Sequence, residues 1–384
     1  MLIDNGDTFK MSNAAEGVFY NASVGSGLTN NGTFKIFQST LTLTGGTTFL
    51  DSSGSTYFGT GSGTVTLRSS NATPIQWYPS TQALSAFGAG QTSEFMGVVF
   101  VGTISLTNSA HLLISGDSTI TGNLTAEDSF YTCVLEVKSG KVLSVEGNIS
   151  MIPPLSVPQT GSIALTGSSD QIVNTSGIKL KTLTHEGAGN VTVAASGLNL
   201  ASDLTNSGIA GNLTITSPGN LKADGVVTAV GAIIQTDFFD IGTLSVAGGH
   251  FRTMSSSGTV DTFVLFNGTF TAPSSSMTVT GDWNKVGNLF NANSGTVTFT
   301  SSGVVSIQGN TAFHGLRAIT SGATVQFDAG ATNSASSFVH LASNTIKSSS
   351  GGTDSNFNYS GSSVTLPLNT ATSVRVASPA VPLS

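Results

Sequence analysis

Charged side chains are scarce in this 384-residue chain, because Asp, Glu, Lys and Arg make up 9% of it, against about a quarter in ordinary soluble domains. The 13 basic residues stand singly and are outnumbered by 20 acidic ones, which gives a formal net charge of −7. Proteins that bind nucleic acid need clustered Lys and Arg to neutralise phosphates. The sequence therefore predicts no nucleic-acid partner.

Cysteine and long apolar runs are also nearly missing. The single Cys133 excludes a disulfide within the chain, and its alternating neighbours in FYTCVLEV predict a buried thiol rather than a reactive one. No apolar run approaches the ~18 residues of a membrane-spanning helix, so we expect no membrane span. The start MLIDNGDTFKMSN lacks the basic and apolar regions of a signal peptide. An export signal would therefore lie upstream of residue 1 or have been replaced by Met1.

The strong helix formers Glu, Lys, Arg and Met are few, whereas Ser (56), Thr (52) and Gly (46) are abundant. Hydrophobic residues still reach 38% and the mean hydropathy is +0.20, so the chain can bury a core. Thr, Val, Ile and the 22 Phe suit a pleated surface. This composition predicts an all-β protein.

Short runs that alternate between apolar residues and Thr recur between Gly- and Ser-rich turn signals. Each run predicts a strand with one buried face and one face that shows Thr. The clearest runs lie at residues 40–44, 64–67, 213–216 and 296–300.

A Gly-Asn-apolar-Thr/Ser tetrad recurs along the chain and starts at Gly122, Gly147, Gly189 and Gly211. The offsets are 25, 42 and 22, and the 42 fits two steps of 21. Gly281-Asp282-Trp283 follows 70 residues later, which is about three more steps. The spacing predicts rungs of roughly 21 to 25 residues, where one rung is one circuit of the chain around a parallel β-helix.

These patterns predict a parallel β-helix, or β-solenoid, of about 16 to 18 short rungs, with tandem β-sandwich domains as the alternative. Residues 151–158 hold three of the ten prolines and offer the best position for a break. We therefore expect an N-terminal solenoid part over residues 1–150 and a continuing solenoid part over 151–347. A Gly/Ser-rich linker and a C-terminal extended strand are expected over 348–384.

No residue pattern predicts catalysis, a cofactor or a metal site. The histidines at positions 111, 185, 250, 314 and 340 form neither HxH nor HExxH. Most carboxylates lie beside Gly, Ser or Asn, where turn chemistry explains them. The closest carboxylate pair, Asp237 and Asp240, would face opposite sides of a strand, and so would the adjacent His185 and Glu186. We therefore expect a protein that is not an enzyme and carries no cofactor.

Two groups of residues remain as candidates for binding. Trp77, Tyr78 and Trp283 are candidates for carbohydrate contact, although we expect Trp283 and its neighbour Asp282 to be structural. The C-terminal segment could cap its own solenoid or add as a strand to a neighbouring subunit. The candidate residues for strand addition are Val364, Leu366, Leu368, Val374 and Val376.

The segment that runs from Gly281-Asp282-Trp283 through Gly287-Asn288-Leu289-Phe290 to Gly295-Thr296-Val297-Thr298-Phe299 resembles the repeats of large secreted bacterial surface proteins. Those repeats pass from G-x-W through G-x-F-x-A to G-T-V-T-F, and this chain carries one extra residue before Phe290. The resemblance is clear over about residues 265–330 and weaker over 160–225 and 40–70. It implies export and a repetitive β-solenoid of the adhesin or surface-fibre kind, without catalytic residues.

Taken together, these features predict an extracellular or cell-surface structural protein. It would be a subunit of a surface fibre, sheath or adhesin that forms a homopolymer through solenoid ends or strand addition, with surface glycans as a second class of partner. The alternative is a β-helical protein that binds or cleaves polysaccharide, such as a phage tailspike. That alternative requires carboxylates and aromatic rings from neighbouring rungs to meet in one groove.

Overall fold

The structure, a computed structural model, describes residues 92–337 except 107–108, 127–131, 154, 159, 208, 255–256, 288 and 329–330, and elsewhere only the backbone of strands. The chain divides into two compact units, Met1–Ala201 and Ser202–Ser384. The described residues form strands and turns. They contain no helix, and therefore no helix long and apolar enough to cross a membrane.

In the first unit the chain passes in order through three walls of parallel strands, named here by one strand of each. The β13 wall contains β1 (Leu2–Ile3), β4 (Leu28–Asn30), β7 (Thr48–Asp51), β10 (Ile75–Tyr78), β13 (Val98–Phe100), β16 (Ser118–Ile120), β19 (Val142–Val145), β22 (Ser162–Leu165) and β25 (Thr182–His185). The β14 wall contains β11 (Ala83–Ser85), β14 (Thr103–Leu106), β17 (Leu124–Ala126), β20 (Ile149–Met151), β23 (Gln171–Asn174) and β26 (Val191–Val193). The β15 wall contains β3 (Glu16–Phe19), β6 (Thr40–Leu43), β9 (Gly63–Ser69), β12 (Gln91–Met96), β15 (His111–Ile114), β18 (Cys133–Val137) and β21 (Leu155–Ser156).

Five further strands complete the first unit. Strands β2 (Thr8–Met11), β5 (Thr33–Ile36) and β8 (Ser55–Phe58) form a small parallel sheet. Strand β24 (Lys179–Leu180) pairs with β27 (Leu198–Leu200), also in parallel.

Strand register in the first unit measures the length of a rung. Val99 pairs with Thr119 and Thr119 pairs with Ser144, so one rung takes 20 residues and the next takes 25. Leu124 pairs with Ile149, which places the tetrads at Gly122 and Gly147 in register, as their spacing predicts. Rungs of different length keep the same register because the extra residues lie in the turns between strands.

The second unit repeats this parallel arrangement with longer strands. Its β31 wall contains β29 (Leu213–Ile215), β31 (Ile233–Thr236), β33 (His250–Thr253), β35 (Thr269–Thr271) and β38 (Leu289–Asn291). The other strands are β28 (Leu204–Asn206), β30 (Asn220–Ala229), β32 (Phe238–Ala247), β34 (Ser257–Phe266), β36 (Ser276–Val279), β37 (Trp283–Val286), β39 (Thr296–Phe299), β40 (Val304–Gln308), β41 (Ala312–Ala318), β42 (Thr324–Phe327), β43 (Thr332–His340), β44 (Thr345–Ser348), β45 (Asn356–Tyr359) and β46 (Arg375–Ala377).

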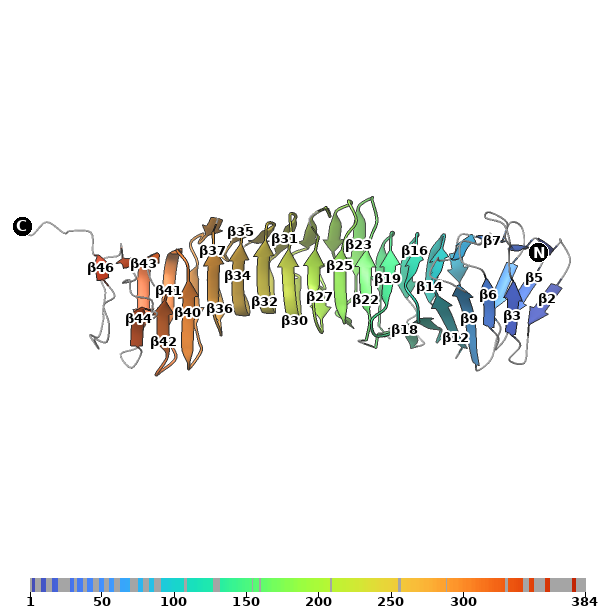
Figure 1. Cartoon of the computed structure of the whole chain (residues 1–384), viewed down its shortest axis with the longest axis horizontal. Coiled ribbons are helices and arrows are strands. Elements are labelled where there is room, and N and C mark those ends of the chain that lie inside the picture. The colour runs from blue at the N-terminus through green and yellow to red at the C-terminus, as the bar shows by residue number, and fades with distance from the viewer. Residues whose placement is uncertain are drawn as a thin grey trace, which may run out of the picture. The chain divides into compact units, whose positions relative to one another are not determined.

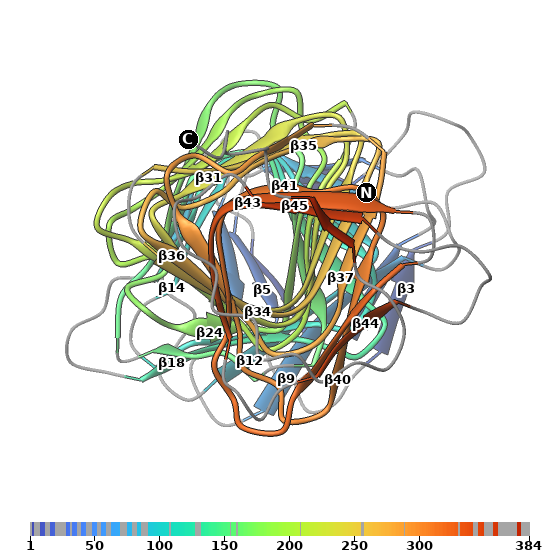
Figure 2. The ribbon, with the colours of Figure 1, turned by 90° about the vertical axis from the view of Figure 1, so that its left-hand side faces the viewer.

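Three of these strands, β30, β32 and β34, are ten residues long and lie side by side (Figure 1). The pairing of β30 with β32 shifts register between Ala223 and Val226, which bends the long strand into two walls. After β34 the two halves continue as separate strands, β36 and β37. The end-on view shows β31 and β35 across the core from β34 (Figure 2).

Aromatic rings fill the core of the second unit. Phe251, Phe270 and Phe290 stack from rung to rung, with 5.9 Å between the centroids of each successive pair. Phe263 stacks on Trp283 at a centroid distance of 4.0 Å. Such stacks add to the free energy of apolar burial, so these rungs are stabilised beyond the apolar area that they bury.

The expected β-solenoid is confirmed, and the structure supports about 12 rungs. The expected number of about 16 to 18 counted the whole chain, including the ends for which only strand backbones are described. Each of the four predicted runs lies on a strand, namely β6, β9, β29 and β39. Cys133 is buried, with 1% of its surface exposed, as predicted.

One assignment within the repeat was wrong. The tetrad at Gly122 leads into β17 on the β14 wall, and the tetrad at Gly211 leads into β29 on the β31 wall. Gly281-Asp282-Trp283 instead leads into β37. This strand pairs with the second half of β34 and does not belong to the β31 wall. Each corner of a rung needs the same small or turn-forming residues, so the same letters recur at corners that are not equivalent.

The proline-rich stretch 151–158 carries β21, the last strand of the β15 wall. Proline removes a backbone donor from a strand, which fits the end of a sheet. The division into parts at residues 150 and 347 stays a prediction.

We expect Gly147→Ala to destabilise the first unit, because a Cβ atom at this position would lie 2.5 Å from the carbonyl carbon and oxygen of Gly122 on the previous rung. Overpacking of this kind typically costs about 1–3 kcal/mol, which thermal and urea unfolding would measure. Gly303→Ala is the control, because its nearest neighbour would be the Ser301 hydroxyl at 3.7 Å. Equal stability of the two variants would contradict the close approach of the rungs.

Candidate functional site

Trp283, a candidate for carbohydrate contact, lies in the core with 0% of its surface exposed. Its indole Nε1 donates a hydrogen bond to Thr311 Oγ1 at 3.1 Å. Its neighbour Asp282 accepts a hydrogen bond from the backbone N–H of Ser306 through Oδ1, at 2.9 Å. A buried indole cannot stack on a sugar from solvent, and both side chains bond to residues later in the chain.

The other predicted binding residues lie largely outside the described side chains. Trp77 and Tyr78 belong to β10, of which only the backbone is described. Val364, Leu366, Leu368 and Val374 lie outside the described residues. Val376 lies in β46, and its backbone pairs with Phe357 of β45 in the same chain.

Asn and Asp side chains at the corners bind the backbone of the following rung. Asn148 Oδ1 accepts from the N–H of Ile172 at 2.7 Å, and the Asn148 N–H donates to Asn123 Oδ1 at 2.8 Å. Asp203 Oδ1 accepts from the N–H of Val226 at 2.8 Å. The same bond to a residue 20 to 25 positions later is made by Asp117, Asp170, Asp282 and Asn310. These carboxylates and amides satisfy backbone groups at the turns, which is the structural use that their sequence context predicts.

The closest carboxylate pair does not form a site. Asp237 is buried, with 5% of its surface exposed, whereas Asp240 is exposed and pairs with Lys222 at 3.4 Å. His185 is buried and its Nε2 lies 2.9 Å from the Gly189 carbonyl oxygen, while Glu186 is exposed. In each pair one side chain is buried and the other is exposed, and one member lies outside a strand, since Asp237 lies between β31 and β32 and Glu186 follows β25.

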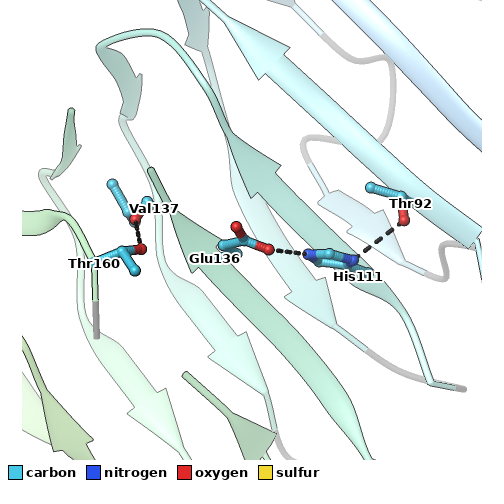
Figure 3. A network of polar contacts seen from close by, with 5 residues as sticks. All are labelled: Thr92, His111, Glu136, Val137 and Thr160. Atoms are coloured by element: carbon cyan, nitrogen blue, oxygen red, sulfur yellow. Dashed lines mark hydrogen bonds and ion pairs between the residues drawn. The ribbon is translucent and has the colours of Figure 1, made fainter. Parts of the chain in front are cut away.

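The most chemically suggestive group in the described part of the chain is a column on the outward face of the β15 wall (Figure 3). Thr92 Oγ1 lies 3.2 Å from His111 Nδ1, and His111 Nε2 lies 3.2 Å from Glu136 Oε2. The three residues come from the neighbouring strands β12, β15 and β18. Each therefore belongs to a different rung, and the column ties three rungs together.

A hydroxyl, an imidazole and a carboxylate in this order are the groups of a nucleophilic relay. Here the approach of His111 Nε2 to Glu136 is close but not aligned for a hydrogen bond, and both side chains are about one quarter to one third exposed, at 26% and 30%. An ion pair at such a site contributes about 0 to 1 kcal/mol. The geometry suits a weak clamp between rungs better than a poised nucleophile.

Sequence reasoning missed this column because it treated the histidines one at a time. The signal was present in the spacing, since Thr92 precedes His111 by 19 residues and Glu136 follows it by 25. Both offsets are close to one rung. Side chains one rung apart with the same orientation are neighbours on a parallel sheet.

Among the described residues, no three His, Cys, Asp or Glu side chains are placed together to hold a metal ion. The chain matches no protein-family model, no curated protein and no solved structure.

We expect Trp283→Ala to lower the free energy of unfolding by about 3–5 kcal/mol, because it removes a buried indole from a stacked core. Trp283→Phe should cost less, since it keeps the ring but loses the bond to Thr311. Phe266→Ala, at a position 57% exposed, is the control and should change the stability by about 0.5 kcal/mol or less. Urea unfolding followed by circular dichroism measures all three, and a Trp283→Ala variant as stable as the control would contradict a structural role.

Proposed function

We propose that this chain is an extracellular or cell-surface structural protein, a subunit of a surface fibre, sheath or adhesin that associates with copies of itself. The observation that carries the proposal is the parallel pairing of successive rungs within each unit. In such a stack the last strand offers the same row of backbone groups that each internal strand uses. A contact between unlike ends does not close on itself and therefore gives a filament.

The use of the polar side chains supports this proposal. The corner Asn and Asp residues bond to the backbone of the next rung, as at Asn148 and Asp282. The chain thus uses much of its limited polar chemistry to hold rungs together. This use suits a protein whose function depends on a stable repetitive surface.

The C-terminal strand supports the route by strand addition. β46 pairs in parallel with β45, with Asn356 opposite Arg375 and Phe357 opposite Val376. A strand that pairs along one edge can accept another strand along its second edge. The same C-terminal segment could exchange between copies, because its own pairing is short.

Electron microscopy of the purified chain over a range of concentrations tests the proposal. We expect filaments whose number and length increase with concentration, and we expect removal of residues 360–384 to reduce them, because β46 is then lost. Discrete particles that never polymerise would contradict self-association. Unchanged assembly of the truncated chain would contradict strand addition and leave contact through the solenoid ends.

Binding or cleavage of polysaccharide is the second candidate, and Glu136, which lies 3.2 Å from His111 on the outward face of the β15 wall, is the carboxylate that cleavage would use as a general acid or base. The test is the release of reducing sugars from a panel of glycans, compared between the native chain and Glu136→Gln. Asp240→Asn is the matched control, since Asp240 is a carboxylate in an exposed pair with Lys222. Activity that Glu136→Gln abolishes and Asp240→Asn preserves would replace the structural proposal with an enzymatic one.

A further inference from the structure

The β31 wall of the second unit carries a strip of outward side chains in two columns. Strand register separates the two columns by two residues along each strand that carries both. The first column is Thr214, Gln235, Arg252, Thr271 and Asn291, and the second is Ile233, His250, Thr269 and Leu289. We call these nine residues the β31 strip.

Arg252 is the positive centre of the β31 strip. It is exposed, and its Nη2 donates a hydrogen bond to Gln235 Oε1 from the neighbouring strand. Gln235 is itself 9% exposed, so the acceptor is held by its surroundings. A guanidinium has five N–H donors in a fixed plane, and the bond to Gln235 orients that plane while leaving most of its donors for a ligand.

His250 lies beside Arg252 on the same face, and its Nε2 is 3.0 Å from Thr271 Oγ1. Burial, and secondly the positive charge of Arg252, lower the pKa of His250. The imidazole therefore stays neutral at neutral pH and is available for hydrogen bonds to uncharged groups.

The β31 strip differs in charge from the chain as a whole. None of the nine residues is a carboxylate, although the chain has a formal net charge of −7. Asp237, which follows β31, is only 5% exposed. An anion that approaches Arg252 along this wall therefore meets hydroxyl, amide and imidazole groups.

We propose that the β31 strip binds a glycan whose sugars carry carboxylates, with Arg252 as the contact for a carboxylate. Arg pairs with a carboxylate through two parallel N–H bonds. Thr271 and Asn291 follow at steps of about 4.8 Å, which gives successive sugars a repeated set of hydrogen-bonding groups. Leu289, which is 62% exposed, offers an apolar surface to the C–H face of a sugar ring.

This site deepens the proposed function, because it names the class of surface glycan that an adhesive solenoid would contact. The proposal rests on that function for the surroundings in which the glycan is met, and not for the contacts that bind the glycan. Binding and self-association are therefore measured separately on the same samples.

Isothermal titration with a β-1,4-linked mannuronate hexamer and with β-1,4-linked mannohexaose tests the proposal, because the two ligands differ only in the carboxylate at C6. We expect the uronate to bind at least tenfold more tightly than the neutral hexamer. Arg252→Gln should weaken uronate binding at least tenfold. Arg252→Lys should recover part of the loss, because an ammonium keeps the charge but not the paired donors.

Arg317→Gln is the matched control, since Arg317 is an exposed arginine of β41 in the same unit and the charge change is identical. It should leave uronate binding within twofold of the native chain. Equal losses in Arg252→Gln and Arg317→Gln would overturn the site and indicate attraction by net charge alone. Failure of the native chain to prefer the uronate would also overturn it.

Electron microscopy of the same samples separates the two proposals. Filaments without uronate binding would overturn the site and leave the structural function. Uronate binding without filaments would support the site and contradict self-association.

Discussion

Hydrogen bonding between the backbones of successive rungs is the interaction on which both units depend. Strands inside a wall pair in parallel with the corresponding strands of the rungs before and after them, at the spacing of about 4.8 Å that a sheet imposes. Every rung must therefore have nearly the same cross-section, whatever its length. Close approach at the corners follows directly, and it explains why a Cβ atom at Gly147 would meet the backbone of Gly122. Extra residues are accommodated only between strands, which is why rungs of 20 and 25 residues stack in one register.

This constraint divides the polar chemistry of the chain between corners and walls. At the corners, Asn and Asp oxygens complete the pairing of backbone groups that the strands leave open, as between Asn148 and Ile172. On the walls, outward side chains one rung apart become neighbours and form columns. The Thr92–His111–Glu136 column and the β31 strip are both products of that register. Because few charges are needed for stability, the few charged side chains on the walls set the chemistry of the outer surface.

The fold could be predicted from the sequence because strand alternation and the Gly-Asn tetrads express the rung directly. The position of each residue within the rung could not. Gly281-Asp282-Trp283 has the letters of a tetrad but lies at another corner, because every corner of the rung imposes the same steric demand. The contacts of His111 were hidden for a related reason, since its partners lie 19 and 25 residues away and the length of each rung varies. The burial of Trp283 depends on which side of β37 faces inward, which is fixed by its pairing with Phe263 and not by its own neighbours in the sequence.

The aromatic stack of the second unit also has a mechanical consequence. The hydrogen bonds between rungs run along the stacking direction, so tension applied along that direction opens them one rung at a time rather than all together. The resistance of a rung to this opening then depends on the apolar side chains that it buries. It is increased where Phe251, Phe270 and Phe290 stack beside Phe263 and Trp283. The second unit therefore contains a reinforced segment, at which a rupture that starts from a weaker rung would stop.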